Sequence, residues 1–162
     1  MKSQDFKNAM AIVPTSVAVV LVGPQDRIRA CTISSLVSVD VEVPQLAFVL
    51  KSESRTLLDI TREDFFSISI LAETQKPLAL EFSNSGSEHS LLDVFGFDFH
   101  GSSQIPYLKK TPVVFFCTFK ETVKLTHSRI VIAMPFSALF NNKVRPLVYQ
   151  NRLFYSLSEN SV

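Results

Sequence analysis

The chain has 162 residues, of which 46% are hydrophobic and 19% are charged, and its formal net charge is +1. This length and apolar content predict one domain over residues 1–162 with its own core, and the near-neutral charge argues against nucleic acid or an acidic membrane as a partner. The N-terminus lacks the order of a signal peptide, and no apolar run approaches the roughly 20 residues of a membrane-spanning helix. We therefore expect a cytoplasmic protein.

Aromatic and sulfur-containing residues narrow the fold class and the kind of site. Fourteen phenylalanines, no tryptophan and only four glycines favour a β-sheet core over a nucleotide-binding fold built on glycine-rich turns. Cys31 and Cys117 have apolar sequence neighbours, no C-x-x-C partner and no histidine cluster nearby. They indicate neither a metal site nor a disulfide, and we interpret both as small buried residues.

The N-terminal third predicts a short helix followed by strands. Apolar residues at helical spacing run from Phe6 to Val13, and Pro14 forbids continuation, so the helix should end near Ile12, with its apolar face against a sheet. The β-branched run 17–22 and the extended segment 27–37 flank a Gly-Pro-containing turn and predict a hairpin.

The middle of the chain predicts two further strands and two short helices. The apolar run 46–50 and the alternating run 65–71 are typical of strands. Between them, Thr56 and Asp59 have the spacing of a capping box, which predicts a helix start there. A second helix is predicted over 74–82, with Pro77 tolerable in its first turn.

The C-terminal half predicts a long excursion and then more strands. Residues 83–106 are rich in small, polar and aromatic residues and predict an excursion outside the central structure, with His89 and His100 on the surface. Two long antiparallel strands should then turn at 126–128, and short strands should follow at 146–149 and 153–157. Many strands, few helices and hairpin connections predict a mainly β fold, an antiparallel barrel with helical decoration, because closure removes exposed strand edges.

Several sequence segments also follow one another along the chain in the order that is typical of one protein family. They are 15–20, 32–39, 44–50 followed by Ser52, Ser54 and Thr56, then 66–72 with Gln75, Leu78, Ala79 and Phe82, then His127, and last 145–149. Over nearly the whole chain this order resembles the flavin reductase domain family. The resemblance implies an FMN-binding split β-barrel that works as a homodimer.

The resemblance also implies the flavin-binding residues. Thr32, Ile33, Ser34 and Ser35 would lie along the flavin ring and ribityl chain, Ser52, Ser54 and Thr56 would hold the phosphate with help from Arg55, and Phe82 would complete the cofactor site. Hydroxyl groups on a turn before a helix suit a phosphate. The alternatives are that Ser54 or Thr56 only caps the helix and that the other hydroxyl residues face solvent on a half-exposed strand.

His127 is the predicted catalytic residue. By resemblance it faces the flavin or the nicotinamide. There it would position the rings and act electrostatically, because the hydride passes directly between the two cofactors and needs no protein nucleophile. A histidine in a turn can also be simply solvated. The chain departs from the family pattern in having Leu125 and Thr126 where Gly-Asp normally precedes the histidine, 39–45 in place of a serine-rich turn, and Arg29-Ala30-Cys31 where a glycine is common.

These observations predict an NAD(P)H-dependent flavin reductase. It would use NADH or NADPH to reduce FMN or FAD, and a separate monooxygenase is a candidate recipient of the reduced flavin. We expect a homodimer that shares its flavin sites, because the apolar strands exceed what one small barrel can cover. One alternative is an FMN-binding electron-transfer or non-catalytic flavoprotein that admits no nicotinamide. Another is a barrel without flavin that acts as an interaction module.

Overall fold

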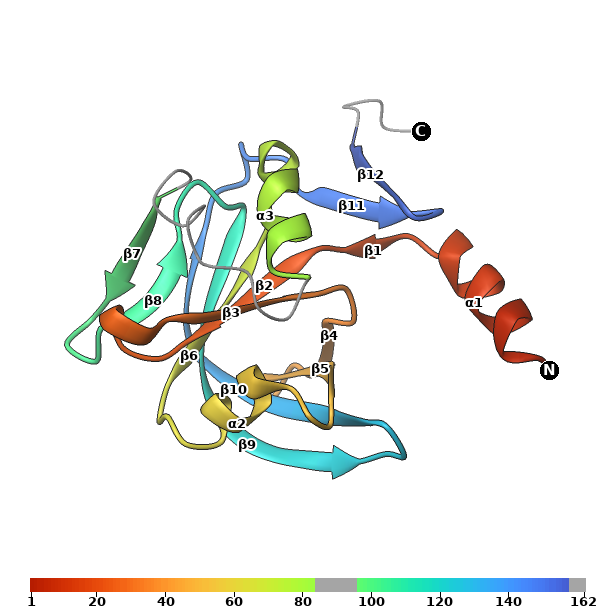
Figure 1. Cartoon of the computed structure of the whole chain (residues 1–162). Coiled ribbons are helices and arrows are strands. Elements are labelled where there is room, and N and C mark those ends of the chain that lie inside the picture. The colour runs from red at the N-terminus through yellow and green to blue at the C-terminus, as the bar shows by residue number, and fades with distance from the viewer. Residues whose placement is uncertain (84–95, 158–162) are drawn as a thin grey trace.

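The computed structural model describes residues 1–83 and 96–157 (Figure 1). The helical elements are α1 (Ser3–Ile12), α2 (Arg55–Ile60) and α3 (Lys76–Glu81), with the 3₁₀ turns η1 (Gln25–Arg27) and η2 (Glu73–Gln75). The strands are β1 (Thr15–Ser16), β2 (Ala18–Val22), β3 (Arg29–Ile33), β4 (Val37–Asp40), β5 (Gln45–Lys51), β6 (Phe66–Ile70), β7 (Phe97–His100), β8 (Ile105–Leu108), β9 (Val113–Lys124), β10 (Ser128–Phe140), β11 (Leu147–Gln150) and β12 (Leu153–Ser156). The prediction of a mainly β protein with short helices is confirmed.

Seven strands form the main antiparallel sheet, in the order β3-β2-β6-β9-β10-β5-β4. The two edge strands, β3 and β4, follow one another in the chain, and residues 34–36 connect them. β3 also approaches β5, the neighbour of β4. The sheet therefore curls until its edges come close without pairing, which gives a barrel with an open seam at residues 34–36 (Figure 1).

β2 is buried on both faces, which explains its unbroken apolar sequence. Val20 and its alternate neighbours point into the core enclosed by the sheet, together with Phe48 and Phe66. Val19 and Leu21 point the other way, into a second core beneath α3. The predicted hairpin of β2 and β3 is confirmed, with Val20 opposite Cys31.

Apolar residues and serines alternate along β6, so the two faces of the strand contact different parts of the protein. Its large apolar residues face the barrel core, while Ser67 and Ser69 are buried on the other face. The Ser67 hydroxyl donates to the Pro106 carbonyl, and the Ser69 hydroxyl accepts from the Leu108 N–H at 3.2 Å. Buried hydroxyls thus fasten β8 to the outside of the barrel.

The predicted excursion contains the hairpin of β7 and β8, a separate two-stranded sheet. His100, which was expected on the surface, is partly exposed there, and its ring stacks on the buried Phe116 with the centroids 3.8 Å apart. The stacking of the imidazole on this aromatic ring of β9 compensates for the water contacts that the imidazole loses. His89 lies outside the described residues.

The capping box predicted at α2 is wrong. Ser54 precedes the first residue of the helix, so Thr56 sits within the first turn, where it is only 4% exposed. Asp59 is engaged by the guanidinium of Arg29 on β3. Thr56 and Asp59, which the local pattern assigned to a helix cap, therefore make tertiary contacts with β3 instead.

The terminal segments lie outside the barrel. β11, β12 and β1 form a three-stranded sheet, and α1 continues from β1 away from the body of the protein (Figure 1). The helix ends at Ile12 as predicted, but no residue of α1 is buried, so the expectation that its apolar face covers a sheet is wrong. That face includes Phe6 and Met10, each about half exposed.

The two thiols differ in burial. Cys117 is fully buried in the barrel core, and this burial raises the pKa of its thiol to about 12. Cys31 is only half-buried, contrary to the prediction, because it lies on the edge strand β3. None of the helices in the described ranges, 1–83 and 96–157, has both the length and the apolar character that crossing a membrane requires.

Candidate functional site

The turn between β5 and α2 carries the predicted phosphate ligands. The Ser54 N–H donates to the Lys51 carbonyl at 3.0 Å, which closes the turn directly after the strand. Ser52 and Arg55 are exposed, and Ser54 is half-buried. These three side chains are therefore available to an anion at the surface of the turn.

Thr56 faces inward from the same turn, toward β3. Its hydroxyl hydrogen-bonds the Cys31 thiol, and this bond and the charge of Lys51 oppose the larger effect of burial, which raises the pKa of Cys31. At 4% exposure, Thr56 contributes to the docking of α2 on β3 more directly than to a surface ligand.

The hydroxyl stretch at the barrel seam is held from two sides. Thr32 donates its hydroxyl to the Ala79 carbonyl at 3.0 Å, and its N–H donates to the Phe82 carbonyl at 3.0 Å. The Ser35 hydroxyl accepts from the Val49 N–H on β5 at 2.9 Å. These bonds fix the backbone on each side of the exposed Ser34.

Two of the predicted contacts point into the protein. Ile33 is 4% exposed and belongs to the barrel core, and Phe82 is 3% exposed and belongs to the core beneath α3. Ile33 presents only backbone at the seam. Phe82 holds α3 in place, and its buried ring argues against direct contact with a surface ligand.

His127 lies beside the turn between β5 and α2 that carries the predicted phosphate ligands, although 75 residues separate it from Ser52 in the sequence. It is exposed in the connection of β9 and β10, and its carbonyl accepts from the Ser52 N–H at 3.2 Å. The pairing of β10 with β5, with Ser128 opposite Lys51, creates this proximity. The fold therefore brings the predicted catalytic residue next to the predicted phosphate ligands.

A cavity of about 340 Å³ opens beside the hydroxyl stretch. Thr32 and Ser34 line one wall, and α3 with Ser83 lines another. The hairpin of β11 and β12 supplies Tyr149, Arg152 and Phe154, none of which is among the predicted site residues. The sequence signal at hand is three aromatic residues, Tyr149, Phe154 and Tyr155, in the last two predicted strands, and a strand pattern alone does not assign them to a site.

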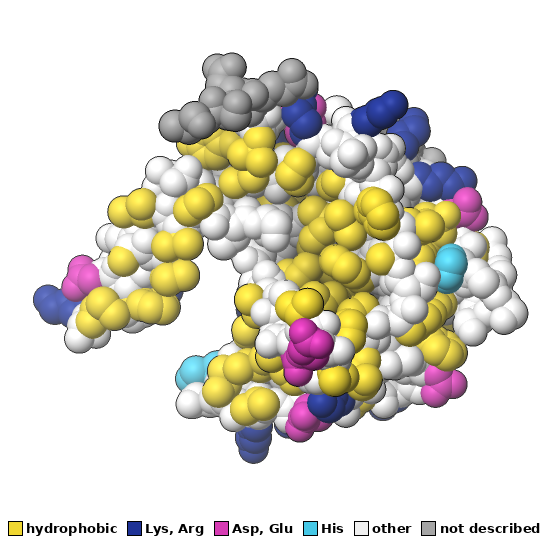
Figure 2. Space-filling model, turned by 180° about the vertical axis from the view of Figure 1, so that it is seen from behind, with side chains coloured by type: hydrophobic (Ala, Val, Ile, Leu, Met, Phe, Trp, Pro, Cys, Tyr) yellow, Lys and Arg dark blue, Asp and Glu magenta, His cyan; other side chains and the backbone are white. Residues whose placement is uncertain are grey.

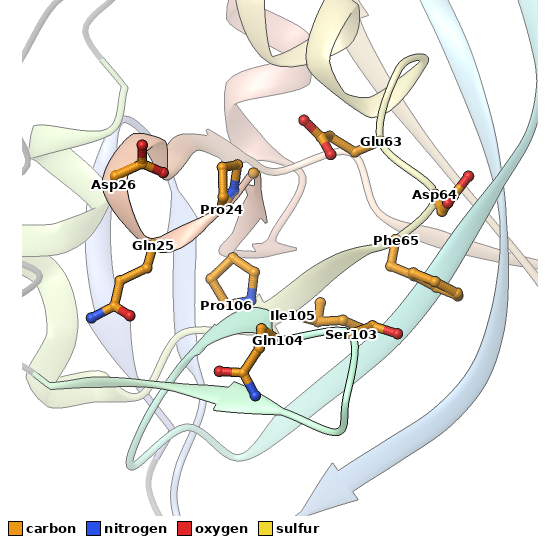
Figure 3. Close-up of a pocket in the computed structure, with 11 residues that line it drawn as sticks. Pro24, Gln25, Asp26, Glu63, Asp64, Phe65, Ser103, Gln104, Ile105 and Pro106 are labelled. Atoms are coloured by element: carbon orange, nitrogen blue, oxygen red, sulfur yellow. The ribbon is translucent and has the colours of Figure 1, made fainter.

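A larger cavity of about 880 Å³ lies elsewhere, between the β2–β3 turn, the segment before β6 and the β7–β8 hairpin (Figure 3). Its lining includes Asp26, Glu63 and Asp64, and none of the predicted site residues. Carboxylates repel the phosphates that flavin and nicotinamide nucleotides carry. The smaller cavity at the seam, which Thr32, Ile33 and Ser34 line, is therefore the candidate site, and the 52–56 turn and His127 lie outside its lining.

Comparison with known proteins identifies the family of this fold and seam. The model of the flavin reductase-like domain matches residues 10–158. The chain belongs to this family. The predicted family membership is thus confirmed, and the match covers every described element except most of α1.

Two curated relatives are flavin reductases by name. The chain is 33% identical over 85 residues to an NADH-dependent FMN reductase of Streptomyces nodosus subsp. asukaensis, an alignment covering 52% of this chain and 46% of the relative. It thus spans less than half the length of that relative. It is 28% identical over 157 residues to an NADH:riboflavin 5′-phosphate oxidoreductase of Streptomyces pristinaespiralis, covering 94% of this chain and 87% of the relative.

Solved structures of flavin reductases share the fold. The flavin reductase of the styrene monooxygenase of Pseudomonas putida S12 superposes with a TM-score of 0.86 at 22% identity, covering 97% of this chain and 99% of that one. An NADH:FAD oxidoreductase of Streptomyces globisporus C-1027, solved with NAD and FAD fragments, gives a TM-score of 0.88 at 18% identity, covering 98% and 94%. The split β-barrel is therefore the fold of this family member.

Proposed function

We propose that the protein uses NADH to reduce a flavin, with FMN as the principal acceptor. The observation that carries this proposal is the gathering of the candidate residues at the seam of a flavin reductase-like barrel. Ser35 contacts β5, Ser52 at the end of β5 contacts His127, and Thr56 contacts β3. The names of both curated relatives favour NADH as the donor and FMN as the acceptor.

The chain's own task in this reaction is to hold two ring systems in contact. Hydride passes from the reduced nicotinamide to the flavin without a protein nucleophile. The hydroxyl stretch and the 52–56 turn would orient the flavin, and the exposed His127 would restrict how the nicotinamide approaches it. Orientation of this kind accounts for a large part of the rate in such reactions. Loss of NADH absorbance on addition of FMN and protein is the direct assay.

We further propose that the protein is a homodimer whose subunits complete each other's sites. Many of the exposed apolar residues lie on three segments: α1 with the residue after it, the second half of β10, and β4 with its following turn. They include Phe6, Met10, Ile12, Val13, Met134, Phe136, Leu139, Phe140, Val37, Val39, Val41 and Val43. Figure 2 shows apolar side chains on both sides of a deep notch between the projecting arm and the body. A surface of this kind marks a protein interface.

A separate monooxygenase is our proposed recipient of the reduced flavin. The support is the styrene monooxygenase reductase, a structure of the same fold whose name assigns it to such a pair. Adding a monooxygenase component from such a pair to the reaction of this protein with NADH and flavin should produce hydroxylated or epoxidised product. In the control, a membrane that only flavin can cross separates this protein from the monooxygenase component.

Removing the hydroxyls of Ser52 and Ser54 should weaken FMN binding much more than riboflavin binding. Only FMN carries the phosphate, and each hydrogen bond to a charged group contributes about 1.5–3 kcal/mol. Titration of the Ser52→Ala/Ser54→Ala variant with both ligands measures the difference. The matched control is Ser102→Ala/Ser103→Ala, two exposed serines on the β7–β8 turn. Equal weakening of both ligands would place the phosphate elsewhere.

Replacing His127 by alanine should lower kcat/KM for NADH about 10-fold, equivalent to about 1.4 kcal/mol, and leave FMN affinity nearly unchanged. The side chain is exposed beside Ser52, so its loss should not disturb the fold. His127→Gln, which retains a hydrogen-bonding group, should recover part of the rate. Wild-type turnover in the His127→Ala variant would show that the histidine is only solvated.

A further inference from the structure

The turn between β11 and β12 has an unusual residue at its tip. Asn151 and Arg152 have φ values of 49° and 62°, so both occupy the left-handed region. A two-residue hairpin turn with two positive φ angles strongly favours Asn-Gly, because glycine takes this conformation without steric cost. This chain carries arginine at the glycine position. Residues held in such conformations cost of order 1 kcal/mol and concentrate at functional sites.

Arg152 is exposed and lines the cavity at the seam, and its guanidinium is bonded to α1. One of its terminal nitrogens donates to the Asn8 Oδ1 of α1 at 2.8 Å. The same turn fastens α1 twice more, by the Asn151 N–H to the Ala11 carbonyl at 2.5 Å and by Gln150 to the Ile12 carbonyl at 2.7 Å. A guanidinium has five N–H donors. After the bond to Asn8, donors remain for an anion in the cavity that Arg152 lines.

The other walls of this cavity suit an aromatic base and a sugar. Tyr149 and Phe154 stand opposite each other on β11 and β12, with ring centroids 5.1 Å apart, and both line the cavity. The ammonium group of Lys76 lies 5.9 Å from the centroid of the Phe154 ring and adds positive potential. Thr32 and Ser34 bring hydroxyl groups from the seam. At about 340 Å³ the cavity is at the small end of the roughly 300–1,000 Å³ of ligand pockets.

We propose that this cavity binds the adenylate half of a dinucleotide, with Arg152 on its phosphate and the Tyr149–Phe154 pair against its adenine. Planar bases stack on aromatic rings, and arginine is suited to bidentate recognition of phosphate. The volume accommodates a mononucleotide better than a whole dinucleotide, so the other half extends along the hydroxyl stretch of the seam. The adenylate comes either from NADH or from FAD, and the choice between them rests on the proposed reductase function.

Titration with adenosine 5′-monophosphate tests the site without any turnover. We expect Arg152→Gly to weaken binding of this probe about 10- to 100-fold, as loss of a hydrogen-bonded charge does, and to leave the affinity for adenosine within about 2-fold. Glycine suits the φ of 62°, so the variant keeps the turn. The control is Lys143→Ala, an exposed cation on the β10–β11 connection outside the cavity. Unchanged affinity in Arg152→Gly, or no binding by the wild type at millimolar probe, would overturn the proposal.

Two pairs of substrates then identify the source of the adenylate. If it is that of NADH, Arg152→Gly lowers kcat/KM for NADH but not for reduced nicotinamide mononucleotide. If it is that of FAD, the variant lowers kcat/KM for FAD but not for FMN. An equal loss with all four substrates would contradict an adenylate site. If the wild type oxidises no NADH with any flavin, the proposed function fails, while the titration still decides on the cavity.

Discussion

Two carboxylates placed on the apolar face of α1 are expected to separate the subunits and strongly slow flavin reduction. Phe6 and Met10 lie one helical turn apart, and each is about half exposed. In a twofold dimer each substitution occurs twice, and an unpaired buried charge costs several kcal/mol. The Phe6→Asp/Met10→Asp variant should therefore be a monomer by light scattering. Its kcat/KM should fall at least about 100-fold, since small displacements of site residues cost that much.

The matched control places the same charges on α1 outside the row of the two apolar residues. Gln4 and Lys7 are exposed on α1, outside the row formed by Phe6 and Met10. Gln4→Asp/Lys7→Asp should remain dimeric and active. A Phe6→Asp/Met10→Asp variant that stays dimeric would remove α1 from the interface, and one that is monomeric but fully active would show that each site is complete within one subunit.

Truncation of Phe48 should have the largest effect on stability. Its ring is fully buried in the barrel core and meets Phe66 edge to face, with centroids 6.3 Å apart. Replacing a buried phenylalanine by alanine costs about 3–5 kcal/mol, because the cavity relaxes only partly. We expect Phe48→Ala to lower the free energy of unfolding by this amount in urea titrations.

An exposed position on the neighbouring helix gives the comparison. Leu58 on α2 is 49% exposed, so Leu58→Ala should change the free energy of unfolding by less than about 0.5 kcal/mol. Equal effects of the two substitutions would mean that Phe48 does not lie in a closed core. They would then contradict the barrel arrangement in which β5 pairs with β10.

Strand positions could be predicted from the sequence because burial leaves a local pattern. The alternation in 65–71 and the unbroken apolar run 17–22 correspond to β6 and β2, and each follows from the faces that those strands bury. The turn at 126–128 between β9 and β10 was likewise predictable. The pairing order of the seven strands is not local, so strand patterns do not determine it, and the resemblance to a known family implied only a split β-barrel.

Side-chain environments were less predictable, because distant elements determine them. Thr56 and Asp59 fit a capping box by spacing, yet β3 supplies partners for both. His100 has a polar side chain in a polar segment, yet it stacks on Phe116 of β9. The same limit applies to the site: the contact of Ser52 with His127 follows from the register of β5 and β10.

Arg152 shows the limit most clearly. In the sequence it is one of 16 basic residues, within a segment that predicts only a short strand pair. Its left-handed backbone and its bond to Asn8 of α1 appear only once the chain is folded. The seam cavity combines β3, α3 and the C-terminal hairpin, and no sequence window contains all three.

Anaerobic mixing of the protein with FMN and NADH tests the central claim most directly. Flavin reduction bleaches the visible absorbance of FMN, while NADH absorbance falls in equal amount. Our account predicts both changes at a rate proportional to protein concentration, with NADH preferred as the donor. If FMN stays oxidised with NADH and with NADPH while the protein binds FMN, the chain is a flavoprotein without reductase activity, and the proposed function is contradicted.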